Sequence, residues 1–307
     1  MASKVAGFAG YSRRWVPPGT LQDTGTDAGH YAHSVRRDTW RHLPALVVCA
    51  VLLAPVVLMV TGSLRQAGLP PPRSPELLPS PIAWGNYERA FELVDIPRYA
   101  LNSLIVAAFA VPLSVLVASW AGFAMSRLPG RSRGLLLAAS LTALMVPVTA
   151  LLVPRFFLFK QLGLIDTYVP LIAPALIGMS PFYVLLFYWA FSRIPEELYE
   201  ASRLEGLTPF QTWWRVGMPL VRPVVLAVGL LAFVVSWSNF LDPLIYLFDQ
   251  ERFTLPLGLK LLSQLDPQNF PLLLAGAVVA TAPVVVAFLV AQRYFLTGYR
   301  PASWFRS

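Results

Sequence analysis

The residue types that carry out covalent chemistry are sparse in this 307-residue sequence. Cys49 is the single cysteine, which excludes a disulfide and a thiolate metal cluster within the chain. No paired aspartates are present to hold a metal-bound phosphate, which disfavours a prenyl or glycosyl transferase. No Gly-x-x-x-x-Gly-Lys-Ser/Thr segment is present to cradle nucleotide phosphates. We therefore expect no catalytic residue, no metal site and no cofactor on this chain.

The polar residues with the clearest local pattern lie between Ile194 and Pro219, in a segment that separates two long apolar runs. Pro195 suits the first position of a helix, and Glu196 and Glu197 suit the first turn because they face its positive end. Gly206 can adopt the left-handed backbone that ends a helix. The segment therefore predicts a short helix over about 195–206.

This predicted helix has two kinds of face. Apolar residues recur at every third position on one face: Leu198, Ala201 and Leu204. Charged residues fall largely on the other faces: Glu197, Glu200 and Arg203. Downstream, Thr208, Pro209 and Gln211 match a capping box that begins a second helix. Because glutamates outnumber arginine on the first helix, we predict that it binds a partner protein and does not lie on anionic lipid.

The elements that position this segment are apolar enough to lie in a membrane. Hydrophobic residues make up 56% of the chain and charged residues only 13%, and the mean hydropathy is +0.59. An apolar window of about 20 residues is long enough to cross the hydrocarbon core as a helix. We predict six membrane-spanning helices, at residues 43–62, 100–126, 134–154, 167–192, 223–241 and 270–292.

The distribution of arginine in the short connections predicts the orientation of these six helices. Arginine is concentrated before the first span, within 127–133 and within 193–222, whereas the alternate connections contain less. We therefore place both termini and the 194–222 segment in the cytosol, with a mostly disordered tail at 1–40, a transmembrane domain at 41–298 and a second tail at 299–307. This topology accounts for the net charge of +8 without a nucleic-acid partner.

Several polar residues lie near the predicted external ends of the spans: Asn102, Ser103, Gln161, Asn239 and Asp242. We expect most of them to cap helices or pack at interfaces, because lipid makes unpaired polar groups costly. Trp237 and Asn239 are the candidates for lining a solute path, since an aromatic face and an amide suit a sugar. The alternative places Trp237 in an interfacial aromatic belt. The proline-rich external loop within 64–98 is predicted to be a stiff spacer, with a docking surface as the alternative.

The run Glu-Ala-Ser-Arg-Leu-Glu-Gly at 200–206, followed by Pro219, resembles the EAA loop of ATP-binding-cassette importer permeases. Ser202 stands where the family pattern has Ala, and Glu205 stands where it has Asp. Further short motifs resemble the carbohydrate-importer branch, the maltose MalG-like permeases: residues 86–87, 102–103, 194–198, 237–240, 254–258 and 292–295. The resemblance covers most of the chain from about residue 40 onward.

The resemblance implies a type I ABC importer permease (MetI-like) fold in a bacterial or archaeal cytoplasmic membrane. It also implies a second, MalF-like permease subunit, a dimer of ATPase subunits that bind ATP and Mg, and an extracytoplasmic solute-binding protein that delivers a sugar. The segment at 195–206 would be the coupling helix that docks on the ATPase, through these residues: Glu197, Glu200, Ala201, Arg203, Glu205 and Gly206.

Two alternatives remain open. The first is a permease of the same fold for glycerol phosphate or another small polar solute. The second is an ion-coupled secondary transporter, which is disfavoured because the span centres lack carboxylates and the chain shows no convincing internal repeat.

Overall fold

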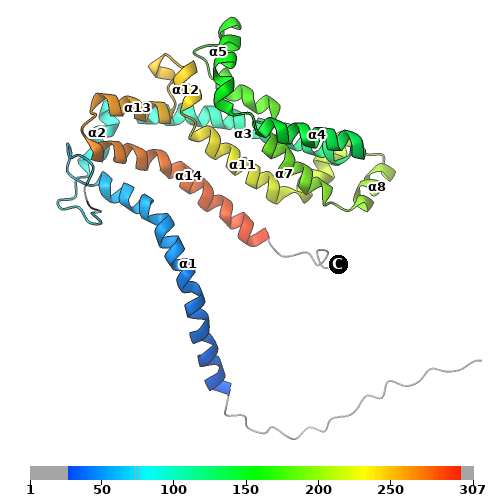
Figure 1. Cartoon of the computed structure of the whole chain (residues 1–307), viewed down its shortest axis with the longest axis horizontal. Coiled ribbons are helices and arrows are strands. Elements are labelled where there is room, and N and C mark those ends of the chain that lie inside the picture. The colour runs from blue at the N-terminus through cyan, green and yellow to red at the C-terminus, as the bar shows by residue number, and fades with distance from the viewer. Residues whose placement is uncertain (1–26, 73, 75, 299–307) are drawn as a thin grey trace, which may run out of the picture. The chain divides into compact units, whose positions relative to one another are not determined.

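The computed structural model describes residues 27–72, 74 and 76–298, and the regular elements in these residues are all helical (Figure 1). The contacts divide the chain into two units near residue 55, and each unit is described by itself. The predicted all-α fold is confirmed over the described residues.

Helix α1 (Asp27–Ser63) contains the first predicted span, and its segment His42–Ser63 is apolar enough to cross a membrane. Residues 27–40 of the predicted tail belong to this helix, and the prediction of a mostly disordered tail at 1–40 otherwise falls on residues that are not described. No proline interrupts 27–43, and each residue added to an existing helix gains a hydrogen bond without a new nucleation cost. Residues 1–26 and 299–307, which hold the rest of the predicted tails, lie outside the described residues.

Three other segments are long and apolar enough to span a membrane as single units. They are α3 (Ile96–Ser126), Val169–Ser192, and Phe270–Tyr294 within α14 (Phe270–Gly298). The segment Val169–Ser192 consists of α6 (Val169–Ile172), η2 (Ala173–Ile177) and α7 (Pro181–Ser192). Two further pairs of consecutive helices are apolar enough when taken together, but each pair is bent at a short break. The described residues therefore contain four candidate spans, or six if each bent pair crosses the membrane once. The predicted number of six is matched in the second case.

The third predicted span, 134–154, is not one continuous helix. Helix α4 (Gly130–Leu144) is followed by η1 (Val148–Leu151) and α5 (Leu152–Gln161), at an angle of 86°. Pro147 lies at the bend with an extended ψ of 129°. Because proline has no N–H and opposes a helical preceding residue, it ends α4 here.

The fifth predicted span, 223–241, is also interrupted. Helix α11 (Arg222–Trp237) has 16 residues, and after three non-helical residues α12 (Leu241–Tyr246) begins. Before α11, the segment Pro209–Leu220 is bent from it by 86° and consists of α9 (Pro209–Gln211), the π-helix η3 (Thr212–Gly217) and α10 (Met218–Leu220). Asn239 lies in the break after Trp237 and is not part of α11. Its side-chain oxygen Oδ1 accepts a hydrogen bond from the Asp242 N–H in the first turn of α12.

The remaining short helices lie near the two ends of α3 (Figure 1). Helices α2 (Gly85–Leu93), η4 (Gln250–Arg252) and α13 (Leu255–Leu265) lie near its start, and α8 (Glu196–Leu204) lies near its end. Helix α3 packs against both α7 and α11. Gly122 permits the close contact with α7, because a Cβ there would lie 2.6 Å from the Cβ of Phe187.

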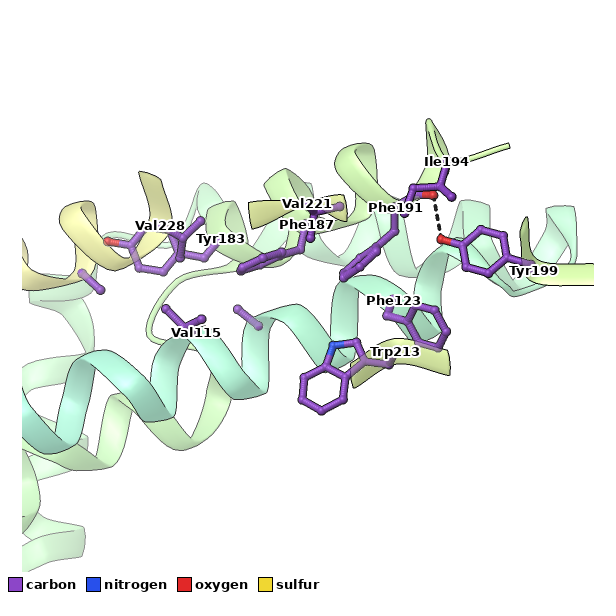
Figure 2. Close-up of a cluster of buried hydrophobic side chains, with 12 residues drawn as sticks. Val115, Phe123, Tyr183, Phe187, Phe191, Ile194, Tyr199, Trp213, Val221 and Val228 are labelled. Atoms are coloured by element: carbon purple, nitrogen blue, oxygen red, sulfur yellow. Dashed lines mark hydrogen bonds between the residues drawn. The ribbon is translucent and has the colours of Figure 1, made fainter. Parts of the chain in front are cut away.

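A cluster of buried aromatic side chains connects α3, α7, α8 and η3 (Figure 2). The Phe123 and Phe191 rings meet edge to face at 5.4 Å, and Phe187 stacks on Phe191 at 6.0 Å. Tyr199 of α8 and Trp213 of η3 complete the cluster. One face of α8 is therefore part of the packed core formed by α3 and α7.

Candidate functional site

Helix α8 forms where the local sequence predicts it. It begins after Pro195, has two glutamates in its first turn, and ends before Gly206, whose φ is +74°. The Gly206 N–H donates to the Arg203 carbonyl at 3.0 Å, which closes the last turn. Thr208 and Gln211 then form the predicted capping box, with reciprocal hydrogen bonds of 2.9 and 3.3 Å. Local rules therefore account for both ends of this helix–turn–helix unit.

The apolar stripe of α8 faces away from the rest of the chain. Leu204 is 90% exposed, and Leu198 and Ala201 are also exposed. The side chains that α8 buries are instead Tyr199 and Ser202, which are 3% and 4% exposed. Helix α8 is therefore fixed to the chain by one face and leaves these apolar side chains exposed on the other.

The predicted charged residues of α8 divide into two groups. Glu197, Glu200 and Glu205 are exposed, and no ion pair within the described part of the chain involves them. Arg203, in contrast, donates to Glu196 Oε1 at 2.5 Å. The glutamates are therefore free to meet a partner, whereas Arg203 already has a partner on its own helix.

Three residues at this site were not among the predicted ones: Arg127, Glu196 and Tyr199. Glu196 Oε2 accepts a hydrogen bond from Arg127 at 2.5 Å, and the Arg127 guanidinium lies 4.0 Å from the centre of the Tyr199 ring. Glu196 and Arg203 are seven residues apart, or two helical turns, and this spacing was a readable signal. The contact of Arg127 with α8 had no local signal, because the two lie 69 residues apart.

Tyr199 is held from two sides. Its hydroxyl donates to the Phe191 carbonyl of α7 at 3.1 Å (Figure 2). Burial raises the pKa of Tyr199 to about 12; the positive charge of Arg127 opposes this rise and Glu196 adds to it. The phenol therefore stays protonated and keeps donating this hydrogen bond throughout the physiological pH range.

The polar residues near the start of α3 are bonded within the chain. The Asn102 amide donates to the carbonyls of Glu251 and Phe253 at 2.9 Å each, and Ser103 Oγ accepts from the Leu255 N–H at 2.8 Å. Ser103 thus caps the first turn of α13. The expected capping and packing roles of Asn102 and Ser103 are confirmed.

The two residues predicted for a solute path lie next to the break after α11. The Trp237 ring is 5% exposed, stacks on Phe233 at 5.6 Å, and donates to the Ala280 carbonyl at 3.0 Å. Asn239 is partly buried and donates to Asp242, which lies 3.6 Å from Arg155. Trp237 therefore packs α11 against α14 here, and a role for either residue in a solute path stays a prediction.

Together, the helical fold and the apolar spans define a polytopic membrane protein, and α8 is a short amphipathic helix between two of its apolar segments. The model of the family described as binding-protein-dependent transport system inner membrane component matches residues 110–300. This range includes α8 together with most of α3 and all the helices from α4 to α14. The chain belongs to this family of transport-system inner membrane components.

Named relatives extend the similarity beyond that range. The chain is 31% identical over 256 residues to the arabinooligosaccharides transport system permease protein AraQ of Bacillus subtilis (strain 168), covering 82% of this chain and 90% of the relative. It is 28% identical to the lactose transport system permease protein LacG of Rhizobium radiobacter, covering 84% of this chain and 96% of the relative. A crystal structure of a bacterial ABC transporter that imports alginate matches with a TM-score of 0.65 at 21% identity, covering 90% of this chain and all of that chain. This structural similarity supports the predicted all-α permease fold.

Proposed function

We propose that this chain is one of two permease subunits of an ATP-driven importer, and that its cargo is a sugar or a sugar oligomer. The observation that carries the mechanism is the outward face of α8, where Leu198, Ala201 and Leu204 are exposed beside unpaired glutamates. The names of the relatives, which include permeases for arabinooligosaccharides, lactose and trehalose, support the class of cargo.

In this proposal α8 is the coupling helix and docks in a cleft of an ATPase subunit. Leu204 supplies the apolar centre, and burying such a side chain contributes about 1.5–3 kcal/mol. Glu200 and its neighbours on the rim meet basic side chains of the ATPase. A groove of about 600 Å³ beside α8, lined by Leu198, Leu220 and Val224 among others, continues this apolar surface. Ala201 and Gly206 allow the partner backbone to come close.

The proposal assigns ATP hydrolysis to other subunits. This chain contains no Gly-x-x-x-x-Gly-Lys-Ser/Thr loop, so ATP and Mg bind to the ATPase dimer. Closure of that dimer would move α8 and switch the pore between inward-open and outward-open states. With α8 and both termini in the cytosol, the opposite side receives the solute-binding protein and the second permease completes the pore. Asn239 remains our candidate for contact with the cargo.

The test compares ATP hydrolysis and uptake in vesicles that contain the complete complex. We expect Glu200→Lys to reduce uptake at least about tenfold, which corresponds to about 1.4 kcal/mol of lost docking free energy. Glu88→Lys on α2 is the matched control, because Glu88 is also exposed and has no ion pair within the described residues. The complex should still insert in the membrane in both variants.

A second variant tests the close approach at the end of α8. A Cβ at position 206 would meet no described atom of this chain within 4 Å, so we expect the larger side chain of Gly206→Trp to extend toward the partner. Gly163→Trp is the control, because Gly163 has the same left-handed backbone, with φ of +68°, and equally open space. Transport-coupled hydrolysis that is unchanged in both Glu200→Lys and Gly206→Trp would rule out docking through α8.

A further inference from the structure

A second set of contacts fixes α8 to the rest of the chain on the face opposite its exposed stripe. Arg127, the residue that follows the last turn of α3, contacts two residues of α8 at once. Its guanidinium donates to Glu196 Oε2 at 2.5 Å and lies 4.0 Å from the centre of the Tyr199 ring. Arg203 occupies the other carboxylate oxygen of Glu196, also at 2.5 Å. Both oxygens of Glu196 are therefore used within the chain.

The same region joins α8 to α7. The Tyr199 hydroxyl donates to the carbonyl of Phe191 in the last turn of α7, and the Tyr199 ring lies 6.1 Å from Phe123 of α3. Figure 2 shows Tyr199 reaching from α8 into the aromatic cluster between these helices. A rotation or displacement of α8 alone would break an ion pair, a cation–π contact and a buried hydrogen bond together. A displacement of α3 and α7 with α8 breaks none of them.

We propose that Arg127 is a positioning residue that makes the end of α3 move with α8, and so converts docking of the ATPase into movement of the membrane-spanning helices. The inference rests on the proposed docking function of α8, and it gives Arg127 a role through its contacts within this chain. The Gly122 contact extends the effect, because it holds α3 and α7 too close together to slide independently.

The chemistry of this position requires arginine. Its planar guanidinium can stack on a phenol ring and donate in its own plane to a carboxylate, whereas the ammonium of lysine is a point charge. Two other arginines, Arg131 and Arg133, lie in the first turn of α4, and both are exposed without an ion pair in the described part of the chain. The orientation of a membrane protein by positive charge needs only the charges within 127–133, so it does not account for the geometry at Arg127.

The first test measures the number of solute molecules taken up per ATP hydrolysed, in vesicles that contain the whole complex. Arg127→Gln should leave the ATPase bound and active while uptake per ATP falls at least about fivefold, the lower end of a typical coupling between sites. Arg133→Gln removes the same charge six residues further along, in the first turn of α4, and should leave the ratio unchanged. Arg127→Lys should give an intermediate ratio. An unchanged ratio in Arg127→Gln overturns the proposal.

The second test measures the movement directly. Spin labels on cysteines at positions 204 and 116, both exposed in this chain, are introduced in a Cys49→Ser background and report the distance from α8 to α3 in labelled complexes that still retain the ATPase and transport. The wild-type arginine should give one narrow distance distribution that is the same with and without ATP, and Arg127→Gln should broaden or shift it when ATP binds. A distance that already changes with ATP while Arg127 is present would contradict the proposal.

The two proposals fail in distinguishable ways. If α8 does not dock on the ATPase, Glu200→Lys leaves coupled hydrolysis and uptake unchanged. If α8 docks but Arg127 has no positioning role, Glu200→Lys impairs uptake whereas Arg127→Gln behaves like Arg133→Gln. ATPase that co-purifies with Arg127→Gln shows that the substitution has not disrupted docking.

Discussion

The side chains near the two ends of α3 differ in whether they are bonded within the chain or left exposed. Near its start, Asn102 and Ser103 are buried and every contact they make ends on this chain, at η4 and α13. Near its end, α8 exposes Leu204 and Glu200 although the same helix buries Tyr199. The difference separates residues that build the subunit from residues that remain available to another subunit. The first group should control stability, and the second should control assembly and coupling.

The largest effect is expected at Leu204, whose side chain is 90% exposed. Leu204→Asp should weaken binding of the ATPase by at least about tenfold, because it loses about 1.5–3 kcal/mol of apolar burial and places a charge in the contact. The dissociation constant of purified ATPase from the permease pair measures this loss. The permease pair should keep its own thermal stability.

Leu78→Asp is the matched control, because Leu78 is 88% exposed on the connection before α2. It introduces the same charge at an equally exposed leucine and should leave ATPase affinity unchanged. Equal losses of affinity in the two variants would remove the distinction between α8 and other exposed apolar positions.

The second prediction concerns the start of α3. Asn102→Ala removes the donor to the partly buried hydrogen bonds with the carbonyls of Glu251 and Phe253, which should lower the free energy of unfolding by about 1–3 kcal/mol for the two bonds together. Thermal unfolding of the purified complex measures the change, with exposed Gln161→Ala as the control. ATPase affinity should stay at the wild-type value. If Asn102→Ala weakened binding of the ATPase without lowering stability, the start of α3 would have the assembly role that we assign to the end near α8.

The ends of α8 could be predicted from the sequence because each depends on nearby residues. Pro195, Gly206 and the pair Thr208 and Gln211 act within one helical turn, and the structure confirms them. A capping or packing role for Ser103 was also predictable, because a polar side chain near a membrane needs a hydrogen-bond partner. Its actual partner, the Leu255 N–H, lies 152 residues away and could not be read from the pattern.

The features that sequence reasoning missed depend on distant contacts or on breaks inside apolar runs. The bend after α4 and the non-helical residues between α11 and α12 lie in predicted spans that are apolar on average, so composition predicts continuous helices there. The Arg127 contact joins two segments that are 69 residues apart in sequence. The helix over 27–40 was missed because its apolar residues show no sustained period.

The smallest predicted effect concerns Trp237. Trp237→Phe keeps an aromatic ring beside Phe233 but removes the donor to the Ala280 carbonyl, which should cost about 0.5–1.5 kcal/mol of stability. The KM for uptake should remain unchanged if this ring only packs α11 against α14. A changed KM at unchanged stability would show that Trp237 contacts the cargo.

The most direct measurement is photo-cross-linking from the exposed face of α8 in the assembled transporter. Leu204→Cys, made in a Cys49→Ser background because Cys49 is an exposed thiol, would carry a photoactivatable maleimide, and Leu78→Cys would carry the same group as a control. We predict that the label at 204 cross-links this chain to the ATPase subunit and that the label at 78 does not. A complex that transports its cargo but yields no ATPase product from position 204 would contradict the account.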